Sequence, residues 1–333
     1  MKFLIIRFSS IGDIVLTTPV IRCLYQQVPD AEIHVLTKSQ YRSIFEANPY
    51  VHKIIELGFS KRLMLHELEV EGYDAIIDLH HNLRTFQIKN VLKGIPSYSF
   101  NKLNWQKWLL TAIKINRLPN KHIVDRYLET VSDFGVVNDG KGLDYFIPEN
   151  HRIQVSDLPF SHQMGYIGLV IGAAHATKQW PVKHWKALCS KVPFPIILLG
   201  GKTDAENGAE IASIDPIKIY NACGKFSLHE SADLVSKARL IIANDTGLMH
   251  IAAAYKKPII SIWGNTVPAF GMTPYYGIEN IPQYQSEVKL GCRPCSKIGY
   301  DSCPRKHFSC MELHDSNQIL QWVEQLINQT NRS

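Results

Sequence analysis

The residues best suited to binding a charged ligand follow the apolar run at 240–243. Asp245 ends that run, Thr246 and Gly247 come next, and His250 lies one turn into a helical pattern. A buried strand, a polar loop and a helix in this order form a ligand-binding edge of an open α/β sheet. The first N–H groups of such a helix favour an anion. Asp245 is equally suited to capping this helix, and His250 to packing in the core, so these structural roles stay open.

Two other loops in the same half of the chain also follow apolar runs. Gly172 and Lys178 follow the run at 166–171, and Gly200 and Gly201 follow another. Glycine lets a ligand approach the backbone, and a lysine supplies a point charge suited to phosphate. Neither loop matches a Walker A or G-x-G-x-x-G pattern, which argues against nicotinamide binding. If the strands are neighbours, the three loops converge on one sheet edge and favour a phosphate-bearing nucleotide.

A fourth loop follows the apolar start of the chain at 3–7. It contains Ser10, Gly12 and Asp13. Asp13 three residues after Ser10 matches a capping box, in which the carboxylate accepts the N–H of the capping residue. A carboxylate at a sheet edge is also suited to removing a proton from a hydroxyl group. Both roles stay open for Asp13.

A separate cluster consists of Cys292, Cys295, Cys303 and Cys310, with His307 among them, spaced as C-x2-C-x7-C-x3-H-x2-C. A C-x2-C pair with two further soft ligands suits tetrahedral zinc. We expect the four cysteines to bind a structural zinc, with His307 as a substitute ligand. Reduced thiols and disulfides are the alternatives. A catalytic zinc is not expected, because four cysteines would close its coordination shell.

The composition is that of a globular protein large enough for two domains. The chain has 333 residues, of which 45% are hydrophobic and 20% charged. No apolar run approaches the ~20 residues of a membrane span. We therefore expect a cytoplasmic protein with reduced cysteines.

The net charge of +6 is concentrated in one segment. Between Asp78 and Asp125 there is no acidic residue, while the segment carries +8, so the rest of the chain sums to −2. This basic segment predicts an anionic partner. No DNA- or RNA-binding motif is present, so nucleic acid is not expected. The cations are Arg84, Lys89, Lys93, Lys102, Lys107, Lys114, Arg117 and Lys121.

The order of elements predicts two Rossmann-like domains with parallel sheets. The pattern loses periodicity at 138–163, where we place a linker. An amphipathic helix at 316–328 ends the chain, and Pro19 should bend a helix at 14–27. Expected strands are 3–7, 32–37, 53–57, 73–79, 166–171, 196–199, 217–220, 240–243 and 259–263, and expected helices are 14–27, 40–47, 85–92, 123–134, 182–191, 204–212 and 228–237.

Four stretches in register closely resemble the ADP-heptose:lipopolysaccharide heptosyltransferase family. They are SSIGD at 9–13, DLH and NLRT within 78–85, KQWP at 178–181 and NDTGLMH at 244–250. Their order and spacing fit over nearly the whole chain. The resemblance implies a GT-B glycosyltransferase, an α/β fold with two Rossmann-like domains facing across a cleft. It also implies a reaction that inverts the anomeric carbon and uses no catalytic metal.

On this resemblance, residues 1–150 form the acceptor domain and 160–315 the nucleotide-sugar donor domain. The final helix at 316–330 returns toward the first domain. The Cys-rich segment 291–311 departs from the pattern of the best-known heptosyltransferases, which lack it.

The resemblance also implies roles for single residues. Asp13 is the expected catalytic base, and Lys178 neutralises the departing diphosphate together with the N–H groups of Thr246 and Gly247. Asp245 is expected to bond sugar hydroxyls or hold its loop. The remaining expected donor contacts are Gly172, Gly200, Gly201 and His250, and the expected acceptor contacts are Ser10, Gly12, His80 and Arg84.

The implied partners are an ADP-sugar and the anionic inner core of lipopolysaccharide. Arg84 is suited to an acceptor carboxylate. The segment 104–115 mixes tryptophan, leucine and lysine as a helix at a membrane surface does, and would make the protein peripheral on the inner membrane. A helix covering the sheet is the alternative for this segment. For the whole protein, the alternatives are a transferase for another nucleotide sugar and a non-catalytic, zinc-containing protein that binds nucleotide sugars or lipids.

Overall fold

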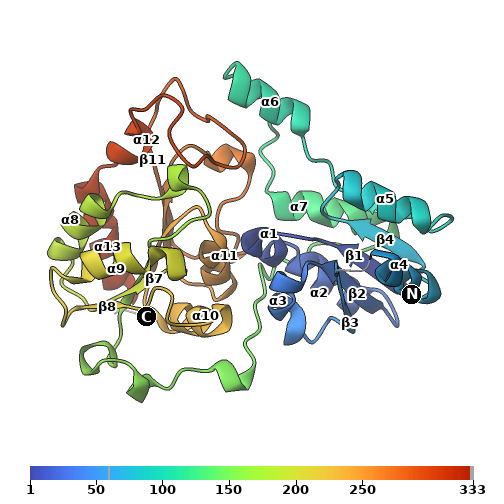
Figure 1. Cartoon of the computed structure of the whole chain (residues 1–333), viewed down its shortest axis with the longest axis horizontal. Coiled ribbons are helices and arrows are strands. Elements are labelled where there is room, and N and C mark those ends of the chain that lie inside the picture. The colour runs from blue at the N-terminus through green and yellow to red at the C-terminus, as the bar shows by residue number, and fades with distance from the viewer. Residues whose placement is uncertain (59–60, 331–333) are drawn as a thin grey trace. The chain divides into compact units, whose positions relative to one another are not determined.

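A computed structural model describes residues 1–58 and 61–330 and shows two compact α/β units, each built on a parallel sheet (Figure 1). The first unit comprises residues 1–103, 121–148 and 277–279. The second comprises 104–120, 149–276 and the residues from 280 onward. The segment 104–120 therefore joins the second unit, although it lies within the expected first domain.

The sheet of the first unit has five parallel strands in the order β3-β2-β1-β4-β5. Its central strand β1 is the apolar run at the start of the chain, and its last four residues are buried. Because β1 lies between β2 and β4, the winding direction reverses at β1 and β4. The strands are β1 (Lys2–Ile6), β2 (Glu32–Thr37), β3 (Lys53–Glu56), β4 (Ala75–Asp78) and β5 (Ser97–Ser99).

The expected helix at 14–27 is two helices, α1 and α2. The chain turns at Leu16 and Thr17, and Pro19 lies in the first turn of α2. Proline is tolerated there because the first helical N–H groups have no partner within the helix. The helices between β1 and the linker are α1 (Ile11–Val15), α2 (Thr18–Gln27), α3 (Ser43–Glu46), α4 (Lys61–Val70), α5 (Leu83–Val91), α6 (Asn104–Ala112) and α7 (Ile123–Leu128).

The sheet of the second unit has six parallel strands in the order β11-β10-β9-β6-β7-β8. The winding reverses between β6 and β9. Strands β9 and β10 are buried along their whole length, which matches their largely apolar sequences, IIAN and IISIW. The strands are β6 (Ile167–Val170), β7 (Ile196–Leu199), β8 (Ile219–Asn221), β9 (Ile241–Asn244), β10 (Ile259–Trp263) and β11 (Gln283–Glu287).

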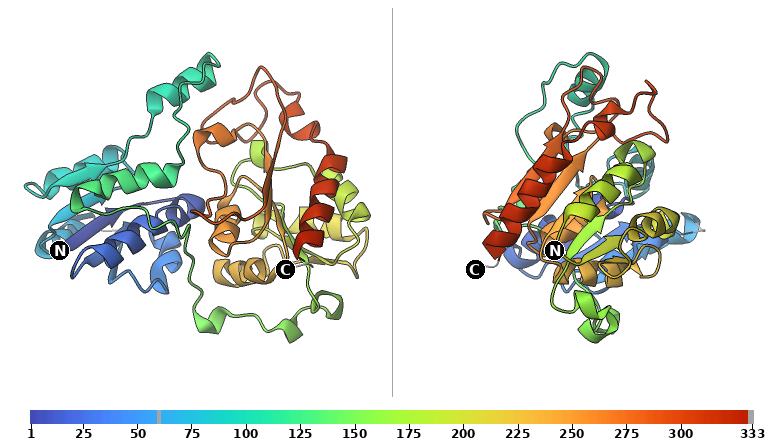
Figure 2. Two further views of the ribbon diagram at one scale, coloured as in Figure 1. Left: turned by 180° about the vertical axis from the view of Figure 1, so that it is seen from behind. Right: turned by 90° about the vertical axis from the view of Figure 1, so that its left-hand side faces the viewer.

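The final helix α13 packs within the second unit, against α8 and β10 (Figure 2). This differs from the expected return to the first domain. Its apolar stripe of Ile319, Val323, Leu326 and Ile327 is buried in the core of the second unit, which explains the difference. The helices of this part are α8 (Val182–Lys191), α9 (Ala205–Ala212), α10 (Leu228–Lys237), α11 (Gly247–Ala254), α12 (Ser309–Glu312) and α13 (Ser316–Thr330).

Among residues 1–58 and 61–330, we find no helix with the length and apolar character needed to cross a bilayer.

A buried ion-pair network fixes α2 to the segment that follows α7. Arg22 is 2% exposed, and its Nε lies 2.7 Å from Oδ2 of Asp139. It also pairs with Asp144 and donates to the carbonyl oxygen of Gly142 at 2.8 Å. Burial alone would lower the pKa of Arg22, but the hydrogen bonds of Asp139 and the charge of Asp144 raise it. Arg22 therefore carries its charge inside the unit.

Arg22→Met is expected to lower the free energy of unfolding by about 3–5 kcal/mol, because it leaves two carboxylates without their cation. Urea unfolding followed by circular dichroism measures the change. The control is Arg42→Met, since Arg42 is 43% exposed and pairs with the exposed Glu46, and a loss below about 1 kcal/mol is expected there. Equal losses in the two variants would contradict a structural role specific to the Arg22 network.

Candidate functional site

The sequence-predicted residues of the first unit gather at the point where its sheet reverses direction. The loops that follow β1 and β4 leave the carboxyl ends of adjacent strands. The first loop carries Ser10 and leads to Asp13 in α1, and the second carries His80. Open α/β sheets bind ligands at such a reversal.

The Asp13 carboxylate is held on two sides. Its Oδ2 accepts hydrogen bonds from the N–H of Ser10 at 3.2 Å and from the Ser10 hydroxyl at 2.7 Å. Its Oδ1 lies 2.6 Å from Nη2 of Arg7. The side chain is 24% exposed. Asp13 thus makes the expected capping contact while its carboxylate stays accessible. Gly12 is buried within α1, and Ser10 is exposed as the N-cap.

Arg7 fixes the loop that carries Asp13, a role that was not predicted from the sequence. Its guanidinium donates to the carbonyl oxygens of Ser9 and Leu79 and to the Tyr127 hydroxyl at 2.8 Å. Burial lowers the pKa of Arg7, but the charge and hydrogen bond of Asp13, together with Tyr127 and Asp78, outweigh burial and raise the pKa. A charged residue directly after a fully apolar strand was the available signal, since such a charge needs partners.

His80 lies beside this arrangement as a neutral imidazole. Its ring packs against that of Phe8 at a tilt of 54°, with centroids 4.7 Å apart. Burial, followed by the charges of Arg7 and Lys102, lowers the pKa of His80 to about 4. The buried Asp78 accepts the N–H of His80 at 3.1 Å and pairs with Lys89 at 3.0 Å.

Folding stability is expected to fall as the pH drops from about 6.5 toward about 4. Between these pH values His80 is protonated in the unfolded chain but stays neutral in the folded one, because its folded pKa is lower. Protonation therefore favours unfolding. His80→Phe keeps a ring against Phe8 and removes the titration, so its loss of melting temperature between pH 7 and pH 5 should be smaller. His314, with a pKa also lowered to about 4, by burial and by the charge of Arg293, should keep part of the loss. An unchanged loss in the variant would contradict this assignment.

Arg84 does not lie in the loop with His80 but is exposed on α5. It lines a pocket of about 590 Å³ in the first unit together with Lys38, Gln40 and Gln87. Apolar side chains of Leu57, Met64 and Ile88 complete the lining, with Ser39 and Gly58. Two cations and two amides around an apolar floor suit an anionic, hydroxyl-rich ligand.

In the second unit, the three predicted loops follow the adjacent strands β9, β6 and β7. The sheet order therefore places their starting points side by side at one edge. Lys178, from the loop after β6, lies with its Nζ 2.7 Å from Oδ2 of Asp245, from the loop after β9. Both side chains are largely shielded, at 16% and 11% exposure. This contact joins the two loops that flank the reversal point.

Asp245 does not cap the following helix. The N-cap is Thr246, and α11 begins at Gly247. The Asp245 carboxylate instead accepts hydrogen bonds from the Lys178 ammonium and, at 2.8 Å, from the Thr266 hydroxyl. The first N–H groups of α11 thus remain directed toward the loop edge, where the helix dipole favours an anion. His250 is 2% exposed in α11, which matches the packed-histidine interpretation.

Asn244 ties the same loops together through its amide. Its Nδ2 donates to the carbonyl oxygen of Ile171 at 2.8 Å, and its Oδ1 accepts the N–H of Trp180 at 3.2 Å. Asn244 is fully buried. From the sequence, Asn244 was placed in the stretch NDTGLMH at 244–250 and given no role of its own. A buried amide that closes two neighbouring loops fixes the backbone around Lys178.

Gly172 and Gly200 face a protein side chain. A Cβ atom at Gly172 would lie 2.0 Å from Oδ2 of Asp204, and one at Gly200 would lie 2.8 Å from its Cβ. Asp204 is 7% exposed and accepts the N–H of Gly201 at 2.8 Å. Burial raises the pKa of Asp204. The space at these two glycines is filled by Asp204, whereas the sequence analysis expected them to admit a ligand.

The Cys-rich segment packs behind this loop edge. Arg293, which is buried, donates to the carbonyl oxygen of Thr266 at 2.8 Å and to those of Trp263, Gly264 and Val288. Thr266 in turn donates to Asp245. The segment therefore supports the residues around Lys178.

Some of the expected metal ligands lie close together. The Sγ atom of Cys292 lies 3.7 Å from Nε2 of His307, and the Cys295 thiol donates to the carbonyl oxygen of Cys292 at 3.2 Å. Burial, with the nearby charge of Cys292, raises the pKa of Cys295, and burial raises that of Cys310 to about 11. None of the described cysteines forms a disulfide.

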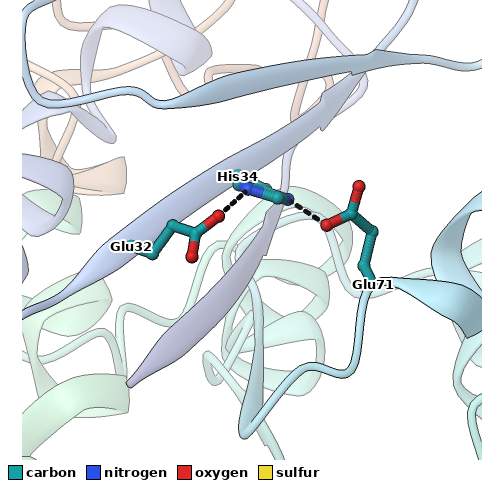
Figure 3. Close-up of side chains that lie close together, drawn as sticks. All are labelled: Glu32, His34 and Glu71. Carbon is teal, nitrogen blue, oxygen red and sulfur yellow. Dashed lines mark hydrogen bonds and ion pairs between the residues drawn. The ribbon is translucent and has the colours of Figure 1, made fainter.

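Within the described chain, another group of three possible metal ligands has its ligand atoms within 4.8 Å of one another, and it lies outside the Cys-rich segment. Glu32, His34 and Glu71 form this group in the first unit (Figure 3). Lys2 lies 3.1 Å from Glu71, and Lys53 lies 2.6 Å from it. Hydrogen bonds of Lys53, opposed in part by burial, lower the pKa of Glu71 to about 2. The two lysines already neutralise the carboxylates, so this group is an ion-pair network of the fold. The Cys-rich segment forms no such closed group within the described residues.

Taken separately, each unit offers one kind of chemistry. The first presents an accessible carboxylate, Asp13, which can take a proton from a hydroxyl group. The second presents a shielded cation, Lys178, and a helix N-terminus at Thr246, which can stabilise a leaving anion.

Comparison with known proteins identifies relatives of the whole chain. Residues 62–299 match the family model described as glycosyltransferase family 9 (heptosyltransferase). The chain is 26% identical over 296 residues to lipopolysaccharide heptosyltransferase 2 of Salmonella typhimurium, a match covering 81% of this chain and 84% of that protein.

Solved structures show the same fold. A glycosyl transferase family 9 protein from Veillonella parvula matches with a TM-score of 0.77 and 22% identity, covering 98% of this chain and 97% of that one. The E. coli heptosyltransferase WaaC with ADP matches with a TM-score of 0.69 and 21% identity, covering 98% and 100%. The two parallel-sheet units are thus a GT-B fold, as expected from the sequence.

Proposed function

Because the chain belongs to glycosyltransferase family 9, the heptosyltransferases, we propose that it moves a heptose from ADP-heptose to the inner core of lipopolysaccharide. The chain is a glycosyltransferase, and the proposal concerns its donor, its acceptor and its mechanism. One observation carries it: in each sheet, the candidate residues lie at the point where the winding reverses. Asp13 marks that point in the first unit, and Lys178 with Asp245 marks it in the second.

We propose a single displacement with inversion. The Asp13 carboxylate takes the proton of the acceptor hydroxyl, whose oxygen attacks the anomeric carbon as the bond to the diphosphate oxygen breaks. ADP leaves with the electron pair of that bond. Arg7, whose Nη2 lies 2.6 Å from the Asp13 carboxylate, fixes the direction of that carboxylate.

The leaving diphosphate needs positive charge, and the second unit supplies it without a metal ion in the proposed reaction. Lys178 and the N–H groups of Thr246 and Gly247 would contact the diphosphate oxygens. Asp245, whose carboxylate also accepts the Thr266 hydroxyl, holds the Lys178 ammonium in place before the donor binds. Gly201, exposed after β7, is proposed as a further backbone contact, and the buried His250 as support for α11.

The acceptor is proposed to bind to the first unit. Its inner-core sugars carry carboxylates, and Lys38 with Arg84 offers two cations at a pocket of about 590 Å³. Ser10 and His80 lie on the loops beside Asp13 and are proposed to bond acceptor hydroxyls. A lipid-borne acceptor places the reaction at a membrane, so we propose a protein that is peripheral on the cytoplasmic face.

A donor screen tests this function. ADP-heptose should raise the melting temperature of the full chain more than UDP- or GDP-sugars do. Transfer to an isolated inner-core acceptor should proceed in EDTA, and nuclear magnetic resonance of the product should show the inverted anomer. A larger shift with a UDP- or GDP-sugar would instead favour a GT-B transferase for that sugar. Retention of configuration would exclude the proposed displacement.

We also propose that the Cys-rich segment binds a structural zinc through Cys292, Cys295, Cys303 and Cys310, with His307 as a substitute ligand. The 3.7 Å approach of Cys292 and His307 supports it, as does a thiol-rich ligand set. Zinc would keep the thiols deprotonated and hold the segment against the loop edge.

Protein purified without a His tag is expected to contain about one equivalent of zinc per chain. Cys292→Ala should lower this content severalfold, whereas Cys23→Ala, which alters a buried core cysteine of the first unit, should leave it unchanged. Elemental analysis by mass spectrometry measures both. Less than about a tenth of an equivalent of any transition metal in the unaltered protein would exclude the site.

A further inference from the structure

The helix α6 exposes the side that a helix of a globular protein normally buries. Trp105 is 65% exposed and Trp108 is 46% exposed. Leu110, at 8% exposure, is the buried residue of the helix. Coil continues the chain on both sides of α6 (Figure 1). The sequence alone left open whether this helix covers a sheet, and the exposed indole rings exclude that its tryptophan side does so.

The helical repeat shows that these exposed residues form one continuous side. Trp105, Trp108 and Ala112 are exposed and Leu109 is half-buried, and the four follow the spacing i, i+3, i+4, i+7 and therefore share a face. The two indole rings stack with their centroids 5.0 Å apart and 18° between their planes. Leu110 lies on the opposite side of the helical repeat. The helix is thus fixed to the protein by one side and presents an apolar stripe on the other.

The coil after α6 extends this surface. Ile113 is 51% exposed and Ile115 is 47% exposed. Lys114, between them, donates from Nζ to the carbonyl oxygens of Thr111 and Pro294. The coil is therefore held in place, and the exposed apolar residues are not on a free end. An exposed apolar surface of this kind marks a binding site.

The charge around α6 selects the kind of partner. The chain has no acidic residue from 79 to 124, where it carries eight cations. Lys107 lies in α6, and the exposed Arg117 follows it. Indole rings beside lysine and arginine suit the boundary between lipid headgroups and acyl chains, where an apolar ring and a charge are both satisfied. A protein partner or nucleic acid would satisfy only part of this set.

We propose that α6 and residues 113–117 dock the protein on an anionic lipid bilayer. The helix would lie in the plane of the membrane with Trp105 and Trp108 at the headgroup level, because nine residues span roughly 14 Å and cannot cross it. Lys107 and Arg117, which lie in the same segment 104–120 of the second unit, would contact lipid phosphates. This surface would hold the protein at the membrane that the proposed function requires, but its binding to lipid needs neither donor nor acceptor.

Vesicle flotation with the full chain, without donor or sugar acceptor, tests the docking. The protein is expected to float with phosphatidylcholine vesicles that contain about a third phosphatidylglycerol, and much less with phosphatidylcholine alone. Raising the salt concentration should weaken binding, because the lipid charge is screened. The double variant Trp105→Ala with Trp108→Ala should have a partition coefficient for these vesicles about tenfold lower than that of the unaltered protein.

The matched control is Phe160→Ala with Met164→Ala, since these apolar residues are 88% and 85% exposed elsewhere in the chain. The control should bind as the unaltered protein does, and both double variants should melt at its temperature. Equal binding by the tryptophan variant, or equal binding to neutral and anionic vesicles, would overturn the proposal. So would displacement of the protein from vesicles by RNA with the same dependence on the tryptophans. Loss of vesicle binding with normal transfer to a lipid-free acceptor would leave the transferase function intact.

Discussion

Asp13→Asn is expected to lower kcat for sugar transfer by roughly 10²–10⁴-fold, the range for loss of a general base. The amide keeps the size of the side chain, and its oxygen can still accept the hydrogen bonds of Ser10 seen at 3.2 and 2.7 Å. It cannot take a proton from the acceptor. Because the substitution lies in the first unit and the proposed nucleotide contacts in the second, the affinity for ADP should change little. Steady-state kinetics and calorimetric titration with ADP measure the two quantities.

The control for this prediction is Asp30→Asn. Asp30 is exposed in the same unit and has a positive φ of 50°, which asparagine adopts readily. Unchanged kcat is expected there. A normal rate in Asp13→Asn would remove Asp13 from the mechanism. A lower rate together with a lower melting temperature would point instead to the contact with Arg7 as a structural one, and Arg7→Lys would then show the same loss of stability.

Lys178→Met is expected to lower kcat/KM for the donor by about 10²–10³-fold, comparable to the loss of a group that stabilises a developing anion. Methionine matches the length of the lysine stem but carries no charge for the diphosphate. If Lys178 acts on the leaving group, the lower kcat/KM should come mainly from a lower kcat. The affinity for ADP should fall as well. Lys178→Arg, which keeps the charge with a different shape, should lose less.

Removing Lys178 also leaves Asp245 without its cation, so the charge on the site must be controlled. The double variant Lys178→Met with Asp245→Asn removes both partners. If the double variant regains most of the rate, the loss in Lys178→Met came from an uncompensated Asp245. If it does not, the ammonium itself acts on the donor. Lys183→Met is the matched control, because Lys183 is 65% exposed and pairs with Glu312 on the surface.

Much of the site was predictable because its residues lie next to strong local signals. The apolar runs that form β1, β6 and β9 are short and end in polar turns, so the loops with Asp13, Lys178 and Asp245 could be placed from the sequence. Parallel strands bring their carboxyl ends to one edge, which led directly to the convergence of the three loops after β6, β7 and β9. The two parallel-sheet units followed from the alternation of strands and helices, and the GT-B fold followed from the resemblance to the heptosyltransferase family.

What could not be predicted depends on contacts between distant residues. Arg7 reaches Tyr127 across the first unit, and Arg293 reaches the carbonyl oxygen of Thr266 across the second. Neither pair has a periodic signal. The sequence left a capping role open for Asp245, but its carboxylate accepts hydrogen bonds from Lys178 and Thr266, and Thr246 is the N-cap.

Other misses have local causes. Strand β11, with the sequence QYQSE, is an edge strand with largely polar and exposed residues, so no apolar run marks it. The single helix expected at 14–27 divides because Pro19 fits a helix start better than a helix interior. For α13, the apolar stripe was read correctly, but a stripe does not specify which core will bury it.

The shared winding of the two sheets has a consequence for how such a protein changes over time. Each half of the chain carries its own reversal point and its own set of polar loops, one beside β1 and β4, the other beside β6 and β9. If the donor binds the second unit and the acceptor the first, as proposed, substitutions after residue 160 would alter the sugar nucleotide while the recipient molecule is retained, or the reverse. The two units are not separate in sequence, since residues 104–120 belong to the second and 277–279 to the first, so an exchange of one half between related genes would also replace part of the other unit.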